Sequence, residues 1–312
     1  MTIETPGLPP PEAPIPETRC GSVAIVGAPN AGKSTLVNGL VGQKVAIVSP
    51  KVQTTRQRLV GIAIHENAQM LLVDTPGIFT PRRRLDRAMV KAAWDGATDA
   101  NVIVLVVDAK AGMRGDVPDI IAALAQRREA KMLVLNKVDI CVKERLLDLA
   151  AKCNALLPFE EIFFVSATTG DGVAELKGAL ANRLPHGPWH YPEDQLSDAT
   201  TRLMATELTR EQLYLQLHAE LPYAATVETE KWEERRDGSV AIHQQIIIER
   251  DSQKAIVLGK GGSRIKEIGA ASRAGISDLM GRKVHLFLHI KVRADWGDDR
   301  SLYSAIGLDF VD

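Results

Sequence analysis

Short apolar runs recur along the first half of the chain and are separated by segments long enough for a helix. Such runs are typical of parallel strands that are buried on both faces of a sheet. They predict a doubly wound α/β domain whose sheet is mostly parallel. The runs are Val23–Val26, Met70–Val73, Val102–Val107, Met132–Leu135 and Ile162–Val165.

The segments between these runs predict helices, because apolar residues recur in them at helical spacing. A further strand is expected over Leu59–His65, pairing antiparallel with the strand that ends at Asp74. The expected helices begin after Gly32 and cover Val117–Arg128, Lys143–Leu156 and Val173–Arg183.

A segment rich in proline, Leu184–Pro192, ends this alternation and indicates a domain boundary. The pattern beyond it predicts the order α-β-β-α-α-β, which is that of a small α+β domain. Its expected elements are a helix over Ser197–His218, strands over Ala224–Trp232 and Val240–Arg250, two helices flanking Gly259–Gly262, and a strand over Lys283–Val292. We therefore divide the chain into a flexible proline-rich tail (1–19), an α/β domain (20–184), a linker (185–196) and an α+β domain with a C-terminal tail (197–312).

Composition limits the class of protein. Of 312 residues, 45% are hydrophobic and 25% charged, which excludes disorder throughout, and the net charge of −1 excludes a globally basic protein that coats nucleic acid. Cys20, Cys141 and Cys153 are too few for a disulfide framework, which fits a reducing compartment. No apolar run approaches the roughly 20 residues that span a bilayer. We expect a cytoplasmic protein, for which surface contact with a membrane stays open.

A phosphate-binding motif follows the first strand. Residues 27–34, GAPNAGKS, connect that strand to a helix, so backbone NH groups and the helix N-terminus would face a phosphate. Lys33 would reach the β- and γ-phosphates, and Ser34 would bind Mg²⁺. The alternative is a chance glycine turn, which the position directly after a strand disfavours.

A second motif selects the base. Residues 136–139, NKVD, follow the strand Met132–Leu135 at the edge of the sheet where ligands bind. The carboxylate of Asp139 can accept hydrogen bonds from the ring NH and the amino group of guanine, neither of which adenine offers there. An isolated NKxD is usually a solvated turn, but its position after this strand favours a guanine site. An ATP-dependent kinase is correspondingly disfavoured.

Three shorter segments complete the expected site. Asp74, in the segment DTPG, ends a strand where it can hold Mg²⁺ through water, and the NH of Gly77 would lie near the γ-phosphate. Thr55 could complete the Mg²⁺ shell when that phosphate is present. Ser166-Ala167 could offer a backbone NH to the guanine carbonyl. Each of these segments alone could equally be an ordinary loop.

Residues 22–184 resemble the Era-type GTPases, which are related to translation factors, because all these motifs occur in order. The resemblance implies a P-loop GTPase fold, Mg²⁺, and catalytic roles for Lys33, Thr55 and Gly77. It implies a metal site at Ser34, Thr55 and Asp74. The implied nucleotide-binding residues are Gly27, Asn30, Ala31, Gly32, Lys33, Ser34, Thr35, Asp74, Gly77, Asn136, Lys137, Asp139, Ser166 and Ala167.

One position departs from the Ras pattern. Ile78 stands where Ras-like proteins carry the glutamine that orients the attacking water, and isoleucine cannot position water. The resembled group includes members that use K⁺ near an asparagine of the phosphate loop, here Asn30. We therefore expect slow intrinsic hydrolysis that K⁺ or a partner raises. The alternative is that Asn30 only stabilises the turn.

The second domain carries a local excess of positive charge. Residues 254–293 hold nine basic and two acidic side chains, which favours a polyanionic partner over an ordinary solvated face. Gly259 and Gly262 bracket a turn between two helices that resembles the GXXG loop of KH domains of the bacterial type, type II, which clamp single-stranded nucleic acid. A packed helical hairpin is the alternative. The expected RNA-binding residues are Gly259, Lys260, Gly261, Gly262, Arg264 and Lys266.

The two resemblances together imply an Era-type assembly factor of the small ribosomal subunit. Such a protein binds GTP and GDP, binds small-subunit ribosomal RNA near its 3′ end, supports maturation of the 30S subunit and associates loosely with the inner membrane. We expect a monomer in which GTP biases how the KH domain presents its RNA clamp. Two alternatives stay open: an RNA-binding protein with a structural nucleotide, and a membrane-associated signalling GTPase whose basic segment contacts anionic lipid.

Overall fold

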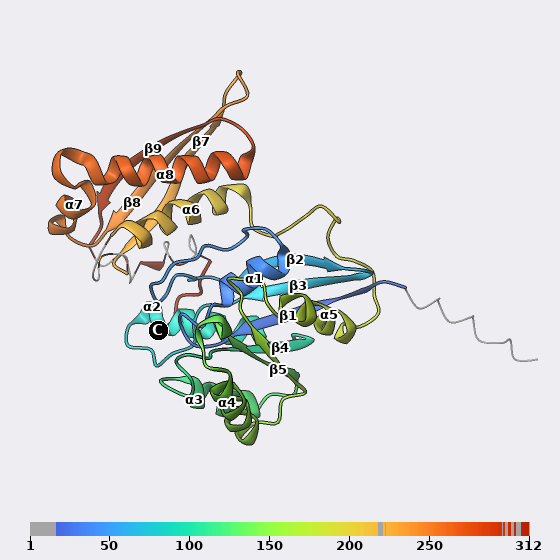
Figure 1. The fold of residues 1–312 in the computed structure, drawn as a ribbon. Coiled ribbons are helices and arrows are strands. Elements are labelled where there is room, and N and C mark those ends of the chain that lie inside the picture. The colour runs from blue at the N-terminus through green and yellow to red at the C-terminus, as the bar shows by residue number, and fades with distance from the viewer. Residues whose placement is uncertain are drawn as a thin grey trace, which may run out of the picture.

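The first half of the chain forms a six-stranded sheet in the computed structural model of the protein (Figure 1). The strand order is β2-β3-β1-β4-β5-β6, in which only β2 runs antiparallel to its neighbour. The mostly parallel sheet and the antiparallel pairing of β2 with β3 are thus confirmed. The strands are β1 (Arg19–Val26), β2 (Leu59–His65), β3 (Ala68–Asp74), β4 (Val102–Asp108), β5 (Ala130–Asn136) and β6 (Glu161–Val165).

The structure describes residues 17–217, 221, 223–294, 296, 299–300, 303 and 307–311. Most of the expected flexible tail, residues 1–16, therefore lies outside the described residues. Its last residue, Arg19, belongs to β1 and hydrogen bonds to the carbonyl of Leu184 at 2.6 Å. The sheet thus starts earlier than the proline content of the tail predicts.

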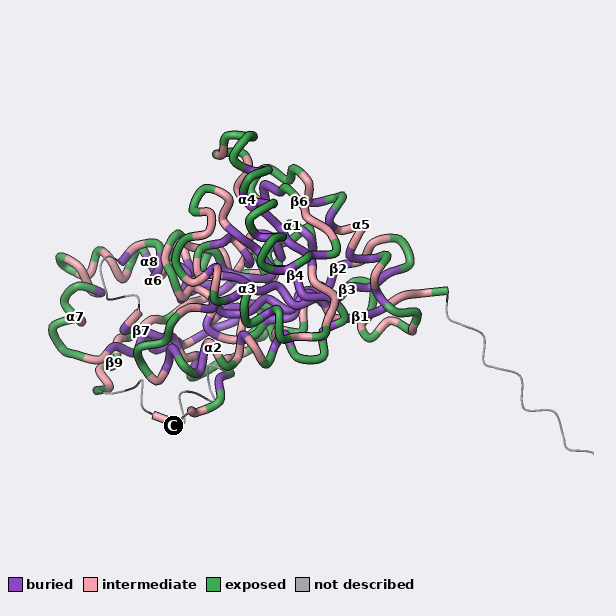
Figure 2. The backbone as a smooth tube through the Cα atoms, turned by 90° about the horizontal axis from the view of Figure 1, so that it is seen from below, coloured by how far each residue is buried: buried purple, intermediate pink, exposed green. Residues whose placement is uncertain are grey.

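Helices cover both faces of this sheet. Val23 and Ile25 of β1 pack with α1 and α5, and Ala24 and Val26 point to the opposite face, where α2, α3 and α4 lie. The strands form the buried centre in Figure 2. The helices are α1 (Lys33–Val41), α2 (Arg84–Ala97), α3 (Val117–Ala125), α4 (Lys143–Leu156) and α5 (Val173–Arg183).

The segment after α5 runs beside the edge strand β2. The NH of Ile62 donates to the carbonyl of Leu196 at 2.8 Å, and the NH of Asp198 donates to the carbonyl of Val60 at 3.1 Å. These bonds and the bridge between Gly61 and Ser197 hold this segment against β2, and α6 begins at Thr201 rather than at Ser197. The hydroxyl of Thr200 caps it by accepting from the NH of Leu203.

The second half has the expected order α-β-β-α-α-β. Its sheet, β7-β8-β9, pairs β7 with β8 antiparallel and β8 with β9 parallel. Ile242 and Ile246 of β8 face the helices and pack with residues of α6 and α8. The elements are α6 (Thr201–Gln216), β7 (Ala225–Glu234), β8 (Val240–Ile248), α7 (Asp251–Leu258), the short helix η2 (Lys260–Gly262), α8 (Ser263–Met280) and β9 (Val284–Val292).

The two halves share an apolar cluster. Leu85 and Met89 of α2 pack with Ile247 of β8 through Trp296 and Tyr303, which follow β9. Trp296 is a core residue and contacts both halves. Among the described residues no helix is long and apolar enough to cross a lipid bilayer.

Candidate nucleotide site and nucleic-acid loop

Two glycines allow the phosphate loop to pass close to neighbouring strands. Gly27 has φ 150°, and a Cβ there would lie 2.3 Å from the carbonyl oxygen of Val106. Gly32 has φ 93°, and a Cβ there would lie 2.2 Å from Nδ2 of Asn136. The loop connects β1 to the N-terminus of α1, so the first NH groups of α1 point to where an anion would bind.

Lys33 is 6% exposed and points back into the loop. Its Nζ donates to the carbonyls of Gly27 and Ala28, both at 3.1 Å. Burial lowers the pKa of Lys33 from 10.5 to about 8, although the Asp74 carboxylate acts in the opposite direction. A buried ammonium held by neutral carbonyls is a strong site for an anion that arrives from the cavity.

The three residues expected to bind Mg²⁺ lie together. Ser34 Oγ is 2.7 Å from Asp74 Oδ2 and 2.8 Å from Thr55 Oγ1, and Thr55 Oγ1 is 3.3 Å from the same carboxylate oxygen. Burial raises the pKa of Asp74, which is fully buried, and its Oδ1 has no hydrogen-bond partner among the described residues. An all-oxygen set with an unsatisfied buried carboxylate oxygen fits Mg²⁺.

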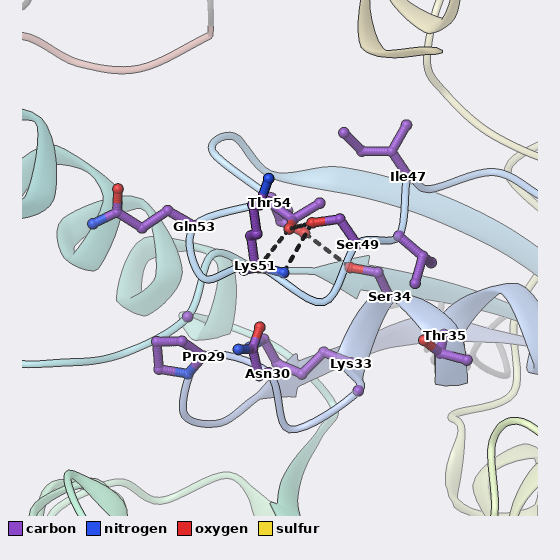
Figure 3. Close-up of a pocket in the computed structure, with 14 residues that line it drawn as sticks. Pro29, Asn30, Lys33, Ser34, Thr35, Ile47, Ser49, Lys51, Gln53 and Thr54 are labelled. Carbon is purple, nitrogen blue, oxygen red and sulfur yellow. Dashed lines mark hydrogen bonds between the residues drawn. The ribbon is translucent and has the colours of Figure 1, made fainter. Parts of the chain in front are cut away.

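Ser34 and Thr55 of this set also line an open cavity (Figure 3). Asn30 and Lys33 lie on one wall, and Ser49, Lys51 and Thr54 lie across from them. The cavity is therefore bounded by the phosphate loop and by the segment that ends at Thr55. Its lining residues also include Pro29, Gly32, Ser34, Thr35, Ile47, Val48, Gln53, Thr55 and Gly77.

Gly77 lies against the phosphate loop. A Cβ at this position would come within 2.9 Å of Pro29 backbone atoms. The next residue, Ile78, donates its NH to the carbonyl of Gly27 at 3.1 Å, and its side chain is buried in the core. Its side chain therefore does not reach the cavity to orient a water molecule.

Asn136 connects two loops of the expected base site. Its Nδ2 donates to the carbonyl of Ala31 at 2.9 Å, and its Oδ1 accepts from the NH of Ala167 at 3.0 Å. The side chain is 2% exposed, and both amide atoms are engaged by backbone. Asn136 thus holds the phosphate loop and the Ser166-Ala167 loop together. The hydroxyl of Ser166 accepts from the NH of Thr169 at 3.2 Å.

Lys137 has a left-handed backbone, with φ 68°. Its Nζ donates to the carbonyl of Asn30 and to Asp108 Oδ2, both at 2.7 Å. The carboxylate of Asp139 is exposed in the short helix that follows, so it is accessible to a base. Sequence reasoning missed Asp108, although an acidic residue directly after the apolar run of β4 was a usable signal.

Asn30 bridges the cavity. It has φ 61°, and its Nδ2 donates to the carbonyl of Pro50 at 3.2 Å. Asn30 therefore contacts the segment on the opposite wall as well as belonging to the phosphate loop.

The glycine loop of the second domain has the geometry of an open clamp. Gly259 has φ 71°, and a Cβ there would lie 2.6 Å from Cβ of Arg264, whereas nothing lies within 4 Å of a Cβ at Gly261 or Gly262. Lys260 and Lys266 are exposed. Arg264, which is also expected to bind RNA, donates from Nη1 to the carbonyl of Gln216 at 2.6 Å, at the end of α6.

The chain matches two family models in the same order as its domains. Residues 22–137 match the family described as 50S ribosome-binding GTPase, and residues 220–297 match the KH domain. A relative from Erythrobacter litoralis (strain HTCC2594), GTPase Era, is 59% identical over 298 residues, which is 94% of this chain and 98% of the relative. The chain belongs to the Era family.

Other members of the Era family extend the match in sequence and in structure. GTPase Era from Bradyrhizobium diazoefficiens is 56% identical over 99% of each chain. The crystal structure of Era in complex with MgGDPNP and nucleotides 1506–1542 of 16S ribosomal RNA superposes with a TM-score of 0.89 at 35% identity, covering 93% of this chain and 99% of that one. The same values hold for an Aquifex aeolicus Era variant bound to GDP·AlF₄⁻.

Proposed function

We propose that this protein hydrolyses GTP and binds the 3′ end of 16S ribosomal RNA through its KH domain during maturation of the small ribosomal subunit. The observation that carries the proposal is the joining of Ser34, Thr55 and the buried Asp74 into one oxygen cluster in a chain that also carries the open glycine loop. The Era structure that holds both MgGDPNP and 16S ribosomal RNA supports both halves of it.

Mg²⁺ would be held by Ser34, Thr55 and Asp74, the last through water. When bound, it neutralises charge on the β- and γ-phosphate oxygens during phosphoryl transfer. Thr55 belongs to the segment lining the cavity, and its hydroxyl joins this cluster. Lys33 would exchange its two carbonyl partners for phosphate oxygens, and the NH of Gly77 would donate to the γ-phosphate.

The base would be read by Asp139 and by the backbone of Ser166-Ala167. Asn136 supports this site by fixing the loops on either side of it. Lys137 fixes the phosphate loop from the same side through the carbonyl of Asn30. Guanine selectivity then follows because adenine would leave the Asp139 carboxylate without hydrogen-bond donors. Such an unpaired carboxylate weakens binding by about a few kcal/mol.

K⁺ is our proposed accelerator of hydrolysis, because buried Ile78 leaves the attacking water without a side chain to orient it. Asn30 lines the cavity and already contacts the carbonyl of Pro50 across from it. The side-chain oxygen of Asn30 and the carbonyl of Pro50 together offer oxygen ligands at this place. Turnover in K⁺ buffer should exceed turnover in Na⁺ buffer, and Asn30→Ala should remove the difference. Equal turnover in the two buffers would reject the ion and leave Asn30 as a turn residue.

RNA would be clamped by the backbone of Gly259–Gly262, with charge from Lys260 and Lys266. The N-terminus of α8 follows this loop directly and favours the phosphates of a single strand. Arg264 would act by fixing the loop to α6, since its guanidinium is engaged there.

The decisive experiment combines hydrolysis and crosslinking on the full chain. Single-turnover assays should show cleavage of GTP and none of ATP. Crosslinking to total cellular RNA should recover 16S ribosomal RNA, and Gly261→Asp should remove that product, because its Cβ enters open space but its charge repels phosphate. RNA recovery without hydrolysis would favour a structural nucleotide. RNA binding that anionic liposomes abolish would favour the membrane-associated signalling GTPase.

We also propose a cytoplasmic location with peripheral contact at the inner membrane, on the basis of the local positive charge of residues 254–293. Fractionation before and after a high-salt wash tests this location. Salt should release the protein from membranes, because only charge contacts would hold it there and salt screens them.

A further inference from the structure

Arg56 lies at the border of the two domains and is 2% exposed. Its Nη1 donates to the carbonyl of Ala225 at 3.0 Å, and its Nη2 donates to the Tyr214 hydroxyl at 3.1 Å and to the carbonyl of Tyr223 at 3.3 Å. Its guanidinium carbon is 5.5 Å from the ring centre of Trp296 and 5.9 Å from that of Tyr214. A residue of the GTPase domain is therefore enclosed by KH-domain and C-terminal side chains.

Arg56 directly follows Thr55 in the chain, and the two side chains serve different sites. Thr55 Oγ1 joins the metal cluster, 2.8 Å from Ser34 Oγ, whereas the Arg56 guanidinium is buried in the second domain. The Tyr214 hydroxyl donates to the carbonyl of Gln53 at 3.1 Å, so it contacts the same segment twice. One peptide unit thus joins the nucleotide site to α6 and β7.

We propose that Arg56 is the positioning residue that couples the nucleotide state to the RNA affinity of the KH domain. This inference rests on the proposed function of the two domains. In the structure Thr55 joins the metal cluster while Arg56, the next residue, lies between Tyr214 and Trp296. Opening of the segment that ends at Thr55 would withdraw the buried Arg56 guanidinium from its three acceptors. Partial movement is therefore costly, and the open and closed arrangements of the segment should be distinct.

Coupling of this kind is reciprocal. If a GTP analogue raises RNA affinity by a given factor, RNA must raise affinity for that analogue relative to GDP by the same factor. Factors of about 5 to 150 are typical of coupled sites. Arg56 touches neither ligand site itself, so its loss should change this factor more than either single-ligand affinity.

The test measures binding of an RNA oligonucleotide from the 3′ end of 16S ribosomal RNA to the full chain, with GDP and with a non-hydrolysable GTP analogue. We expect tighter RNA binding with the analogue in the unaltered protein. Arg56→Met should bring the ratio of the two RNA affinities to within about twofold of one, and Arg56→Lys should retain part of it. The ratio of analogue to GDP affinity, measured with and without RNA, should change in parallel.

Lys44→Ala is the matched control. Lys44 also crosses the domain border, through an ion pair of 2.6 Å with the buried Glu211, but it is remote from Thr55 in the chain. Lys44→Ala should lower the melting temperature but leave the ratio of RNA affinities with the analogue and with GDP unchanged. If Arg56→Met keeps the ratio, or if Lys44→Ala removes it equally, the coupling role of Arg56 is overturned.

Failure of the proposed function is distinguishable from failure of this inference. An unaltered protein that binds no GTP, or no RNA in either state, rejects the proposed function. An unaltered protein that binds both ligands with no difference between GDP and the analogue rejects the coupling alone. If Arg56→Met unfolds, a folded Arg56→Lys whose two RNA affinities are equal also counts against the inference.

Discussion

Lys51 and Arg264 both donate hydrogen bonds to the same end of helix α6. Nζ of Lys51 donates to the carbonyls of Tyr214 and Leu217, and Nη1 of Arg264 donates to the carbonyl of Gln216. The end of a helix leaves carbonyls without intrahelical partners and favours positive charge. One cation lines the nucleotide cavity and the other follows the glycine loop, so the end of α6 lies between the two sites.

This arrangement predicts different effects of two basic residues on RNA binding. Lys260 is exposed in the glycine loop, so Lys260→Ala should remove one phosphate contact and reduce the slope of log affinity against log salt by about one. Arg264→Ala should leave that slope nearly unchanged, because its guanidinium is engaged by Gln216. Titration of an RNA oligonucleotide over a series of KCl concentrations measures both slopes.

Arg264→Ala should instead lower stability. It removes a charged hydrogen bond to a helix end, which is worth about 1.5–3 kcal/mol, and thermal melting should show the loss. A slope reduced as much as in Lys260→Ala would mean that Arg264 leaves α6 and contacts the RNA directly, as the sequence predicts.

Asp139→Asn should change the preferred base. The carboxylate accepts two donors of guanine, and an amide cannot accept both, so GTP affinity should fall at least about 100-fold. Xanthine carries a carbonyl where guanine carries its amino group, so the amide can donate to it and XTP should bind better than GTP. Calorimetric titrations with GTP, XTP and ATP measure the change. Asp148→Asn, an exposed carboxylate of α4, is the matched control and should leave the preference unchanged.

Asn136→Ala should weaken nucleotide binding and also destabilise the first domain. The substitution leaves the Ala31 carbonyl and the Ala167 NH without their partner, and each unmade bond costs about 1–3 kcal/mol when buried. Thermal melting without nucleotide reports the destabilisation, and calorimetry reports the binding loss. A melting temperature equal to that of the unaltered protein would show that the two loops do not depend on Asn136.

Local pattern was enough to predict the sheet, because the strands of a sheet covered on both faces must be continuously apolar. The expected strand Leu59–His65 and helix Lys143–Leu156 match β2 and α4 at both ends. Helix α2 was missed, although its buried residues, among them Leu85, Ala88 and Met89, recur at helical spacing and were a usable signal.

The motifs predicted which residues meet at the metal cluster, since strand ends and the loop between them converge at one edge of the sheet. The sequence did not predict the contacts between the domains. Nothing near Arg56 or Lys51 in the chain indicates that their partners lie in α6 and β7, because docking of two domains depends on surfaces distant in sequence. The same holds for the bond from Arg264 to the carbonyl of Gln216 in α6.

Nucleotide binding should take up protons near pH 8. Burial lowers the pKa of Lys33 from 10.5 to about 8 in the nucleotide-free protein, whereas bound phosphates would raise it again. Above pH 8 the free protein has lost this proton and the complex keeps it, so binding takes up a proton and affinity falls by up to about tenfold per pH unit. Below pH 8 both states carry the proton, and the effect disappears.

Calorimetry in buffers of different ionisation enthalpy measures this uptake directly. The binding heat at pH 8.5 should depend on the buffer. At pH 6.5 the part of this buffer dependence that comes from Lys33 should largely disappear. Lys33→Arg is the control, because a guanidinium stays charged over this range and should show no uptake at pH 8.5. Buffer-independent heat at pH 8.5 in the unaltered protein would mean that Lys33 already carries its full charge inside the empty loop.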